Sequence, residues 1–332
     1  MARLCVLGAG SWGTALAIAL ASRFETVSLW ARTPERALEI KRSGENRRYL
    51  PGLLLPKNVE VVSEIQSAVA EGGIVLAVIP SQYFRCVLQE AEQNLHSDAI
   101  LVSATKGIEG GTLFRMSQVL RDIAGQDGRR RIAVLSGPTF AKEIAAGEPA
   151  AVVIASEEMA VAEAIQHAFA TPTLRFYAST DVVGVELGAA LKNVIAIGAG
   201  ICRGLGLGSN SVAALVTRGL AEITRLSVAM GGQPRTLSGL AGLGDLVLTA
   251  TGDLSRNRFV GIRLGEGHKL SQILADMTMI AEGVETCRAA YQLGAQTGVD
   301  LPIINKMYEV LYESKDPRLA IRELMERPLT SE

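Results

Sequence analysis

Three glycines near the start of the chain, Gly8, Gly10 and Gly13, have the spacing G-x-G-x-x-G. The apolar run at 4–7 before them is typical of a strand, and the Ala- and Leu-rich run from Thr14 onward is typical of a helix. In such a turn the first glycine permits the bend, the second lets the backbone approach a pyrophosphate, and the third lets the helix pack against the strand. The N–H groups at the helix start then face the phosphates. The spacing favours a dinucleotide site over a glycine-rich turn without a ligand.

Arg32 follows a second apolar run, at 26–30, and bears on the choice between nicotinamide dinucleotides. An acidic residue there would bind the 2′-hydroxyl of NAD, whereas a cationic residue suits the 2′-phosphate of NADP. A surface arginine at the start of a loop is the alternative. We expect NADPH to be preferred, with NADH also accepted. Tyr49, in the basic loop at 46–52, either packs near the adenine or anchors the loop.

Lys192 is the one cation in the apolar run at 182–201 and is a candidate for acid–base chemistry. At helical spacing it shares a face with small and apolar residues such as Gly188 and Ile195. A buried lysine without a partner loses its proton more readily than an exposed one, so it could exchange a proton with a carbonyl or alcohol oxygen. The alternatives are an amine that reaches solvent or one that pairs with Glu186.

Further along, polar residues gather in a glycine-rich stretch and just after it. Asp245 has apolar neighbours, an unusual setting for an acid that only faces water. Ser255, Arg256 and Asn257 place a hydroxyl, a guanidinium and an amide side by side. Such a set could bind a phosphate through charge-assisted hydrogen bonds, although a helix cap explains the same tripeptide.

Continuous apolar strands alternate with helices in the first half of the chain, for example at 74–79, 100–103 and 132–135. This alternation indicates a parallel sheet covered on both faces. Lys106 and the segment 137–141 follow two of these strands, at the edge where open α/β sheets place their ligands. After about residue 181 only helix-length segments follow. We expect an α/β protein with an N-terminal Rossmann-type, mostly parallel sheet at 1–181 and an all-helical C-terminal domain at 182–332.

Composition argues against several classes of partner. The 332 residues contain 33 Lys+Arg and 34 Asp+Glu, a balance that gives no reason to expect nucleic acid or an anionic membrane surface. No apolar run reaches the ~18 residues that cross a bilayer without interruption, so membrane insertion is not expected. Four scattered cysteines and three isolated histidines predict free thiols, no metal site and a cytoplasmic protein. A homodimer through the helical domain is compatible with the sequence.

Seven short motifs extend over essentially the whole chain. They are GAGSWGTALA at 8–17, ATKG at 104–107, SGPTFA at 136–141, LKN at 191–193, AGLGDL at 241–246, SRN at 255–257 and EGV at 282–284. In this order they resemble the bacterial NAD(P)-dependent glycerol-3-phosphate dehydrogenases. The resemblance implies reversible reduction of dihydroxyacetone phosphate to sn-glycerol 3-phosphate, which supplies glycerophospholipid synthesis.

The resemblance also implies residue roles. Lys192 would act as the proton donor or acceptor, and Lys106 would lie between cofactor and substrate as the second catalytic residue. Besides the three glycines, the residues implied to contact the dinucleotide are Ser11, Trp12, Arg32, Tyr49, Lys106, Ala141, Arg256 and Glu282. Those implied to contact the substrate are Lys106, Gly137, Thr139, Lys192, Asp245, Ser255, Arg256 and Asn257.

Two other functions stay open on the sequence. A β-hydroxyacid-type dehydrogenase acting on another small substrate would also combine a Rossmann domain, a helical domain and a lysine. A non-catalytic dinucleotide sensor would bind the cofactor without turnover, but it would leave the polar residues at 245–257 without a purpose.

Overall fold

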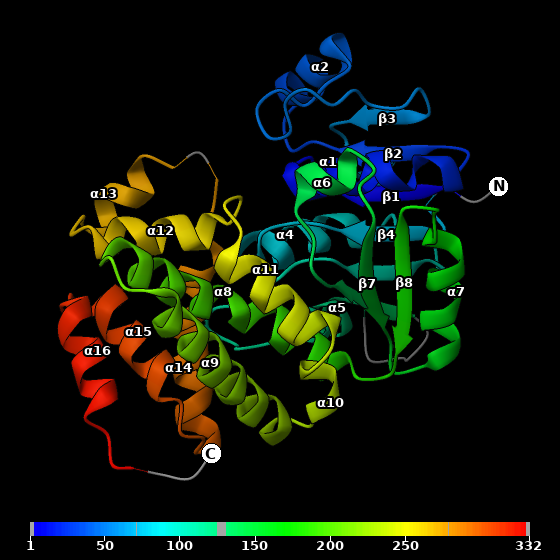
Figure 1. Ribbon diagram of the computed structural model, residues 1–332. Helices are drawn as coiled ribbons and strands as arrows, with labels where there is room; N and C mark the ends of the chain where they lie inside the picture. The colour runs from blue at the N-terminus through cyan, green and yellow to red at the C-terminus, as the bar shows by residue number, and fades with distance from the viewer. Residues whose placement is uncertain (1–2, 71, 125–130, 278, 330–332) are drawn as a thin grey trace. The chain divides into compact units, whose positions relative to one another are not determined.

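The computed structural model describes residues 3–70, 72–124, 131–277 and 279–329. The chain divides into two compact units, Met1–Val185 and Glu186–Glu332 (Figure 1). The first unit contains a sheet and the second is built from helices, so the predicted fold class is confirmed.

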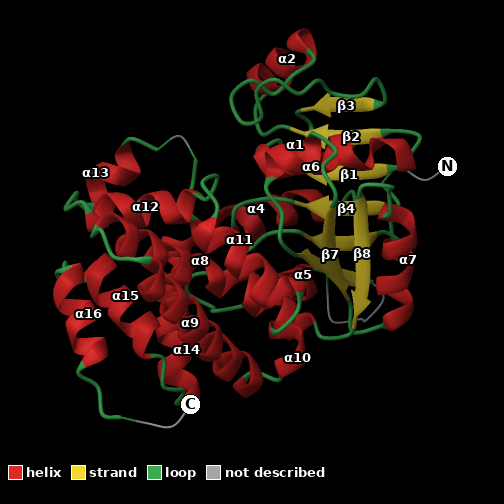
Figure 2. Cartoon of the chain, viewed as in Figure 1, coloured by secondary structure: helices red, strands yellow, loops and turns green. Residues whose placement is uncertain are grey.

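The sheet of the first unit has eight strands within the described residues, in the order β3-β2-β1-β4-β5-β6-β7-β8 (Figure 2). Neighbouring strands are parallel except for β6 and β7, which are antiparallel. The order reverses at β1, and the switch point between β1 and β4 is where open α/β sheets bind ligands. The strands are β1 Leu4–Leu7, β2 Val27–Trp30, β3 Val59–Val62, β4 Ile74–Ala77, β5 Ile100–Ser103, β6 Ile132–Ser136, β7 Ala150–Ala155 and β8 Leu174–Ser179.

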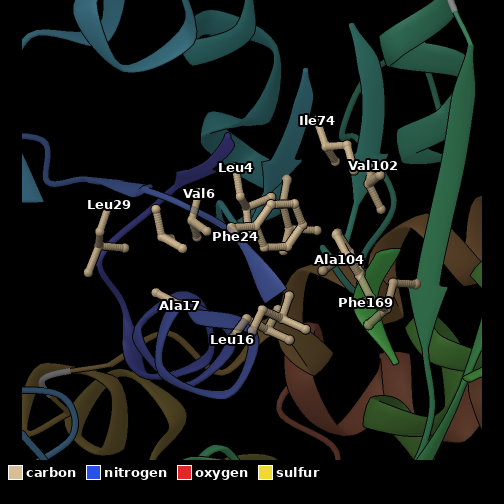
Figure 3. Close-up of a cluster of buried hydrophobic side chains, with 14 of the residues drawn as sticks. Leu4, Val6, Leu16, Ala17, Phe24, Leu29, Ile74, Val102, Ala104 and Phe169 are labelled. Carbon is tan, nitrogen blue, oxygen red and sulfur yellow. The ribbon is translucent and has the colours of Figure 1, made fainter. Parts of the chain in front are cut away.

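Two separate apolar clusters pack against the two faces of this sheet. One cluster, drawn in Figure 3, contains Leu16, Phe24 and Phe169, with an edge-on contact of 5.9 Å between the ring centres of Phe24 and Phe169. The other contains Phe84 and Met116. The first face is covered by α1 Ser11–Leu20, α2 Pro34–Ser43, α6 Ala141–Ala145 and α7 Met159–Phe169, and the second by α3 Ile65–Ala70, α4 Ser81–Glu92 and α5 Met116–Ile123.

Helix α1 begins earlier than the sequence predicts. It starts at Ser11 rather than Thr14, with Gly10 as its N-cap in an extended conformation. The third glycine of the motif, Gly13, is therefore already helical and buried. The predicted start at Thr14 was wrong because the apolar run shows only which residues pack on the sheet. The first turn of α1, from Ser11, comes before that run.

The second unit contains helices and no strand among the residues described after Val185. Its longest helices are α8, which begins in the first unit and carries Lys192, and α9. The helices are α8 Val182–Gly204, α9 Ser209–Ala229, α10 Pro234–Leu237, α11 Asp245–Thr251, α12 Arg256–Gly265, α13 Leu270–Ala275, α14 Glu282–Thr297, α15 Pro302–Tyr312 and α16 Pro317–Met325, with a π-helical turn at Leu240–Gly244 before α11.

Among the described residues, helix α8 is the one candidate for a membrane span. Its 23 residues are long and apolar enough to cross a membrane by length and composition, with a mean hydropathy of 1.6 over an 18-residue window. The sequence prediction concerned an apolar run without interruption, and Glu186 and Lys192 do interrupt this one. Within the protein 94% of that window is buried, as in the central helix of a folded core.

Candidate active site

The glycine turn after β1 leaves open the side that a ligand would approach. Gly8 has a φ of +121°, and a Cβ there would lie 2.4 Å from the carbonyl oxygen of Val78. A Cβ on Gly13 would lie 1.9 Å from the oxygen of Gly8, whereas a Cβ on Gly10 would meet no described atom within 4 Å. The outer glycines are thus required by packing, and the middle one faces open space.

The first turn of α1 supplies donors at this opening. No side chain of the described residues caps the helix at Gly10, and its first turn carries no acid. The backbone N–H groups can therefore bind an anion with the help of the helix dipole. The indole N–H of Trp12 is buried and has no partner among the described residues. These observations fit a bound pyrophosphate.

Cationic and aromatic side chains lie around the end of β2. The Arg32 guanidinium lies 5.9 Å from the ring centre of Tyr83, and the guanidiniums of Arg36 and Arg48 lie 5.2 and 5.3 Å from that of Tyr49. Flat rings beside guanidiniums suit a purine and an anionic group. The structure therefore supports a basic surface at this point of the sheet, as the sequence predicts.

Lys106 and the segment after β6 come together at the carboxyl edge of the sheet. The Lys106 amine donates to the carbonyl oxygen of Gly137 at 3.2 Å, and the Thr139 hydroxyl donates to the same oxygen at 3.1 Å. A Cβ on Gly137 would lie 2.9 Å from the Cα of Val152, so close strand packing requires glycine there. Ala141 begins α6 directly afterwards. The proximity of these residues agrees with their predicted place at neighbouring strand ends.

In the second unit Lys192 is buried, with 4% of its surface exposed, but it is paired. Its ammonium donates to the carboxylate of Asp245 and, at 2.7 Å, to the Thr249 hydroxyl. That hydroxyl in turn donates to the backbone oxygen of Asp245 at 2.6 Å. The interpretation of Lys192 as a buried amine without a partner was therefore wrong, because α11 brings Asp245 to it.

The tripeptide 255–257 divides between structural and ligand-facing roles. The Ser255 hydroxyl caps α12 by accepting the N–H of Arg258 at 3.2 Å, as the helix-cap alternative proposes. Arg256 donates to the carbonyl oxygen of Ile280 at 3.0 Å. The side-chain oxygen of Asn257 accepts the N–H of Gly283 at 3.0 Å, which directs the amide so that its NH₂ group is the end available to a ligand.

Thr249 was not predicted as a site residue of this region. Thr249 lies one helical turn after Asp245, and that i,i+4 spacing is the signal that could have found it. Gly283 lies in the first turn of α14, beside Glu282, where a Cβ would be 2.7 Å from the Asn193 oxygen and 2.8 Å from the Asn257 side-chain oxygen. Because Gly283 has no side chain, there is room for the Asn257 amide at this position.

Reciprocal glycines join α8 to α12 at backbone contact. A Cβ on Gly200 would lie 2.1 Å from the oxygen of Arg258, and one on Gly261 would lie 1.9 Å from the oxygen of Ile197. Gly204 and Gly265 repeat the contact one turn later, where Cβ atoms would lie 2.2 Å from the oxygen of Ile262 and 2.6 Å from that of Ile201. This packing fixes the separation between the helix that carries Lys192 and the helix that begins with Arg256 and Asn257.

A Rossmann-type sheet with an open glycine turn, followed by a helical unit with a buried lysine–aspartate pair, is the architecture of a two-domain nicotinamide-dependent dehydrogenase. The chain belongs to the NAD-dependent glycerol-3-phosphate dehydrogenase family: the model of the family's N-terminus matches residues 3–162, and that of its C-terminus matches residues 181–322.

Individual relatives agree with this assignment. A Geobacter sp. (strain M21) protein named glycerol-3-phosphate dehydrogenase, NAD(P)+, is 52% identical over 330 residues, covering 99% of this chain and 98% of the relative. The crystal structure of glycerol-3-phosphate dehydrogenase from Coxiella burnetii has a TM-score of 0.94 at 36% identity, covering 98% of this chain and 99% of that one. A ketopantoate reductase structure from Ralstonia eutropha, with a TM-score of 0.62 at 16% identity over 98% of this chain and 100% of that one, shares the fold.

Proposed function

We propose that the protein reduces dihydroxyacetone phosphate to sn-glycerol 3-phosphate with NADPH or NADH, reversibly, and so supplies glycerophospholipid synthesis. The observation that carries this proposal is the buried Lys192–Asp245–Thr249 group, which lies in the part of the chain that matches the family's C-terminus. The relatives' printed names supply the substrate and the two cofactors.

The first unit would hold the dinucleotide. We assign this role to residues 1–181 and substrate binding to residues 182–332. The glycine turn and the N-terminus of α1 would bind the pyrophosphate, with Arg32 and Tyr49 at the adenosine end. When bound, the reduced nicotinamide supplies the hydride. The assigned dinucleotide contacts are Gly8, Gly10, Ser11, Trp12, Gly13, Arg32, Tyr49, Lys106, Ala141, Arg256 and Glu282.

In the second unit Lys192 would deliver a proton to the oxygen of the ketone as that oxygen gains negative charge. Asp245 and Thr249 orient the ammonium, so its N–H groups are held in fixed directions before the substrate binds. Lys106 would stabilise the developing charge as a second cation. The buried position of Lys192 and its hydrogen bonds to Asp245 and Thr249 favour protonation of the ketone oxygen at one fixed position.

Substrate recognition would depend on the phosphate. Arg256 and the NH₂ group of Asn257 would bind it through charge-assisted hydrogen bonds. Because the phosphate is held away from the reacting carbon, its binding would position the ketone near Lys192. The other assigned substrate contacts are Lys106, Gly137, Thr139, Lys192, Asp245 and Ser255. We further propose a cytoplasmic location, which fits two water-soluble, charged substrates and which cell fractionation would test.

The proposal is tested by following nucleotide oxidation at 340 nm with dihydroxyacetone phosphate, in parallel assays with NADPH and NADH. We expect turnover with both, faster with NADPH because of Arg32. The Lys192→Ala variant should lose turnover and still bind NADPH like the wild type. Unphosphorylated hydroxy acids should not react. Turnover of a hydroxy acid, or none with dihydroxyacetone phosphate in protein that binds NADPH, would reject the proposed function.

A further inference from the structure

Asn46 connects the loop after α2 to the glycine turn. The residue is completely buried. Its side-chain NH₂ group donates to the backbone oxygen of Ala9 at 2.9 Å and to the hydroxyl of Thr14 at 2.8 Å. Ala9 lies inside the glycine motif and Thr14 lies in the first turns of α1, so this single amide holds both sides of the turn.

Further contacts of the loop connect Asn46 to a second point of the same turn. The side-chain oxygen of Asn46 accepts from the Arg36 guanidinium at 2.8 Å, and that guanidinium lies 5.2 Å from the ring centre of Tyr49. The backbone oxygen of Tyr49 accepts from the Ser11 hydroxyl at 2.5 Å. The path therefore leaves the turn at Ala9 and returns to it at Ser11.

The bond to Ala9 has a consequence for phosphate binding. The carbonyl of Ala9 and the N–H of Gly10 belong to one planar peptide group and point in opposite directions. A partner that fixes the carbonyl therefore also fixes the direction of the N–H. Without Asn46 the carbonyl would be left unpaired beside a buried site, and the peptide could rotate to find another donor.

We propose that Asn46 is a positioning residue for the dinucleotide, acting through the Ala9–Gly10 peptide on the donors that bind the pyrophosphate. Asparagine suits this task because its amide supplies two donors for the turn and an acceptor for Arg36. Aspartate has nearly the same shape but only acceptors when ionised, so it would repel the Ala9 oxygen. The inference rests on the proposed function only in taking NADPH as the ligand.

Asn58 offers a matched control in the same unit. Its side-chain NH₂ group also donates to two backbone oxygens, those of Ala21 at 2.9 Å and Phe24 at 3.0 Å. These acceptors lie after the end of α1, outside the glycine motif. Substitution of Asn58 therefore removes the same kind of hydrogen bonds without touching the turn.

The test compares the dissociation constants of NADPH and of adenosine 2′-monophosphate, which lacks the pyrophosphate, by calorimetric titration. For Asn46→Asp we expect NADPH to bind about tenfold to a hundredfold more weakly, the range that an unmade buried hydrogen bond produces. Adenosine 2′-monophosphate should keep its affinity to within about threefold, since it does not reach the turn. Asn58→Asp should bind both ligands with wild-type affinity. If Asn46→Asp does not fold, Asn46→Ser is used in its place.

Two outcomes would overturn the inference. One is a folded Asn46 variant that binds NADPH as tightly as the wild type. The other is an Asn46 variant that loses the same affinity for both ligands, together with an Asn58 variant that loses as much. That result would mean that Asn46 only stabilises the fold. A wild-type protein that binds NADPH without reducing dihydroxyacetone phosphate would contradict the proposed function alone. The role of Asn46 would still be decided by comparing the dissociation constants of NADPH and adenosine 2′-monophosphate between the variants and the wild type.

Discussion

At the scale of single residues, Thr249 holds the buried ion pair of Lys192 and Asp245 in place. Its hydroxyl accepts from the Lys192 ammonium at 2.7 Å and donates to the backbone oxygen of Asp245 at 2.6 Å. Thr249→Val keeps the shape and removes both bonds. We expect kcat for dihydroxyacetone phosphate to fall about tenfold to a hundredfold, since a hydrogen bond to a charged group contributes roughly 1.5–3 kcal/mol. Steady-state kinetics would measure this, and the dissociation constant of NADPH should not change.

Thr251 provides the control for this prediction. It lies in the same helix, and its hydroxyl donates to the backbone oxygen of Val247 at 2.7 Å on the exposed side. Thr251→Val should therefore leave kcat at the wild-type value. Equal rates for both variants would show that the Thr249 hydroxyl does not orient Lys192.

The pairing of Lys192 with Asp245 marks a limit of inference from the sequence. Each residue stands out because a charge in an apolar stretch is costly. They are 53 positions apart, however, and only the packing of α11 against α8 brings them together. Asn46 was missed for a related reason: nothing in the basic loop distinguishes an asparagine that is buried against the glycine turn from one that faces water.

At the scale of elements, the reciprocal glycines of α8 and α12 should be intolerant of even a methyl group. In Gly200→Ala the Cβ would lie 2.1 Å from the backbone oxygen of Arg258, with no flexible side chain to move aside. We expect the free energy of unfolding to fall by about 1–3 kcal/mol, the usual cost of overpacking. Urea unfolding followed by far-UV circular dichroism would measure it. The Michaelis constant for dihydroxyacetone phosphate should rise, because α12 carries Asn257.

Gly73 serves as the comparison, because it is exposed and a Cβ there would meet no described atom within 4 Å. Gly73→Ala should change the free energy of unfolding by less than about 0.5 kcal/mol. If the two alanine variants were equally stable, the close approach of α8 and α12 would not be a constraint on this fold.

Apolar strands buried on both faces were predicted well, whereas the edge strand β3 was not. The runs that form β1 and β4 are apolar throughout because the sheet is covered on both sides. Strand β3 was missed: it is a four-residue edge strand, and Glu60 interrupts its apolar pattern by facing solvent. The contact between the reciprocal glycines of α8 and α12 was also missed. The spacing of glycines in a helix indicates a surface for close packing, but it does not indicate which helix packs there.

At the scale of the whole molecule, one buried acid should give the free energy of unfolding a pH dependence near neutrality. Glu222 of α9 is 2% exposed and accepts the N–H groups of Ile303 and Ile304, at 2.7 and 3.1 Å, at the start of α15. Burial raises the pKa of this carboxyl from its ordinary 4.5 to about 7, against the opposing effect of the two N–H groups and Arg225. Asp300 acts in the same direction as burial.

The sign follows from the proton balance. Between pH 4.5 and 7 the folded protein keeps a proton on Glu222 that the unfolded chain has lost, so stability falls as the pH rises. The shift corresponds to about 3 kcal/mol, complete below pH 4.5 and lost above about pH 7. The formal net charge of −1 at pH 7 means that general charge repulsion adds little slope there.

Glu222→Gln should remove this slope, because its amide does not titrate. Urea unfolding from pH 4.5 to 8 should show the stability difference, wild type minus variant, falling by about 3 kcal/mol as the pH rises. The variant should also lose some stability at every pH, since its NH₂ group faces one of the two N–H donors. Glu313→Gln, at the other end of α15, should follow the wild-type pH dependence. A difference between wild type and Glu222→Gln that stays constant with pH would mean that Glu222 remains ionised in the folded protein, with the two N–H groups of α15 outweighing its burial.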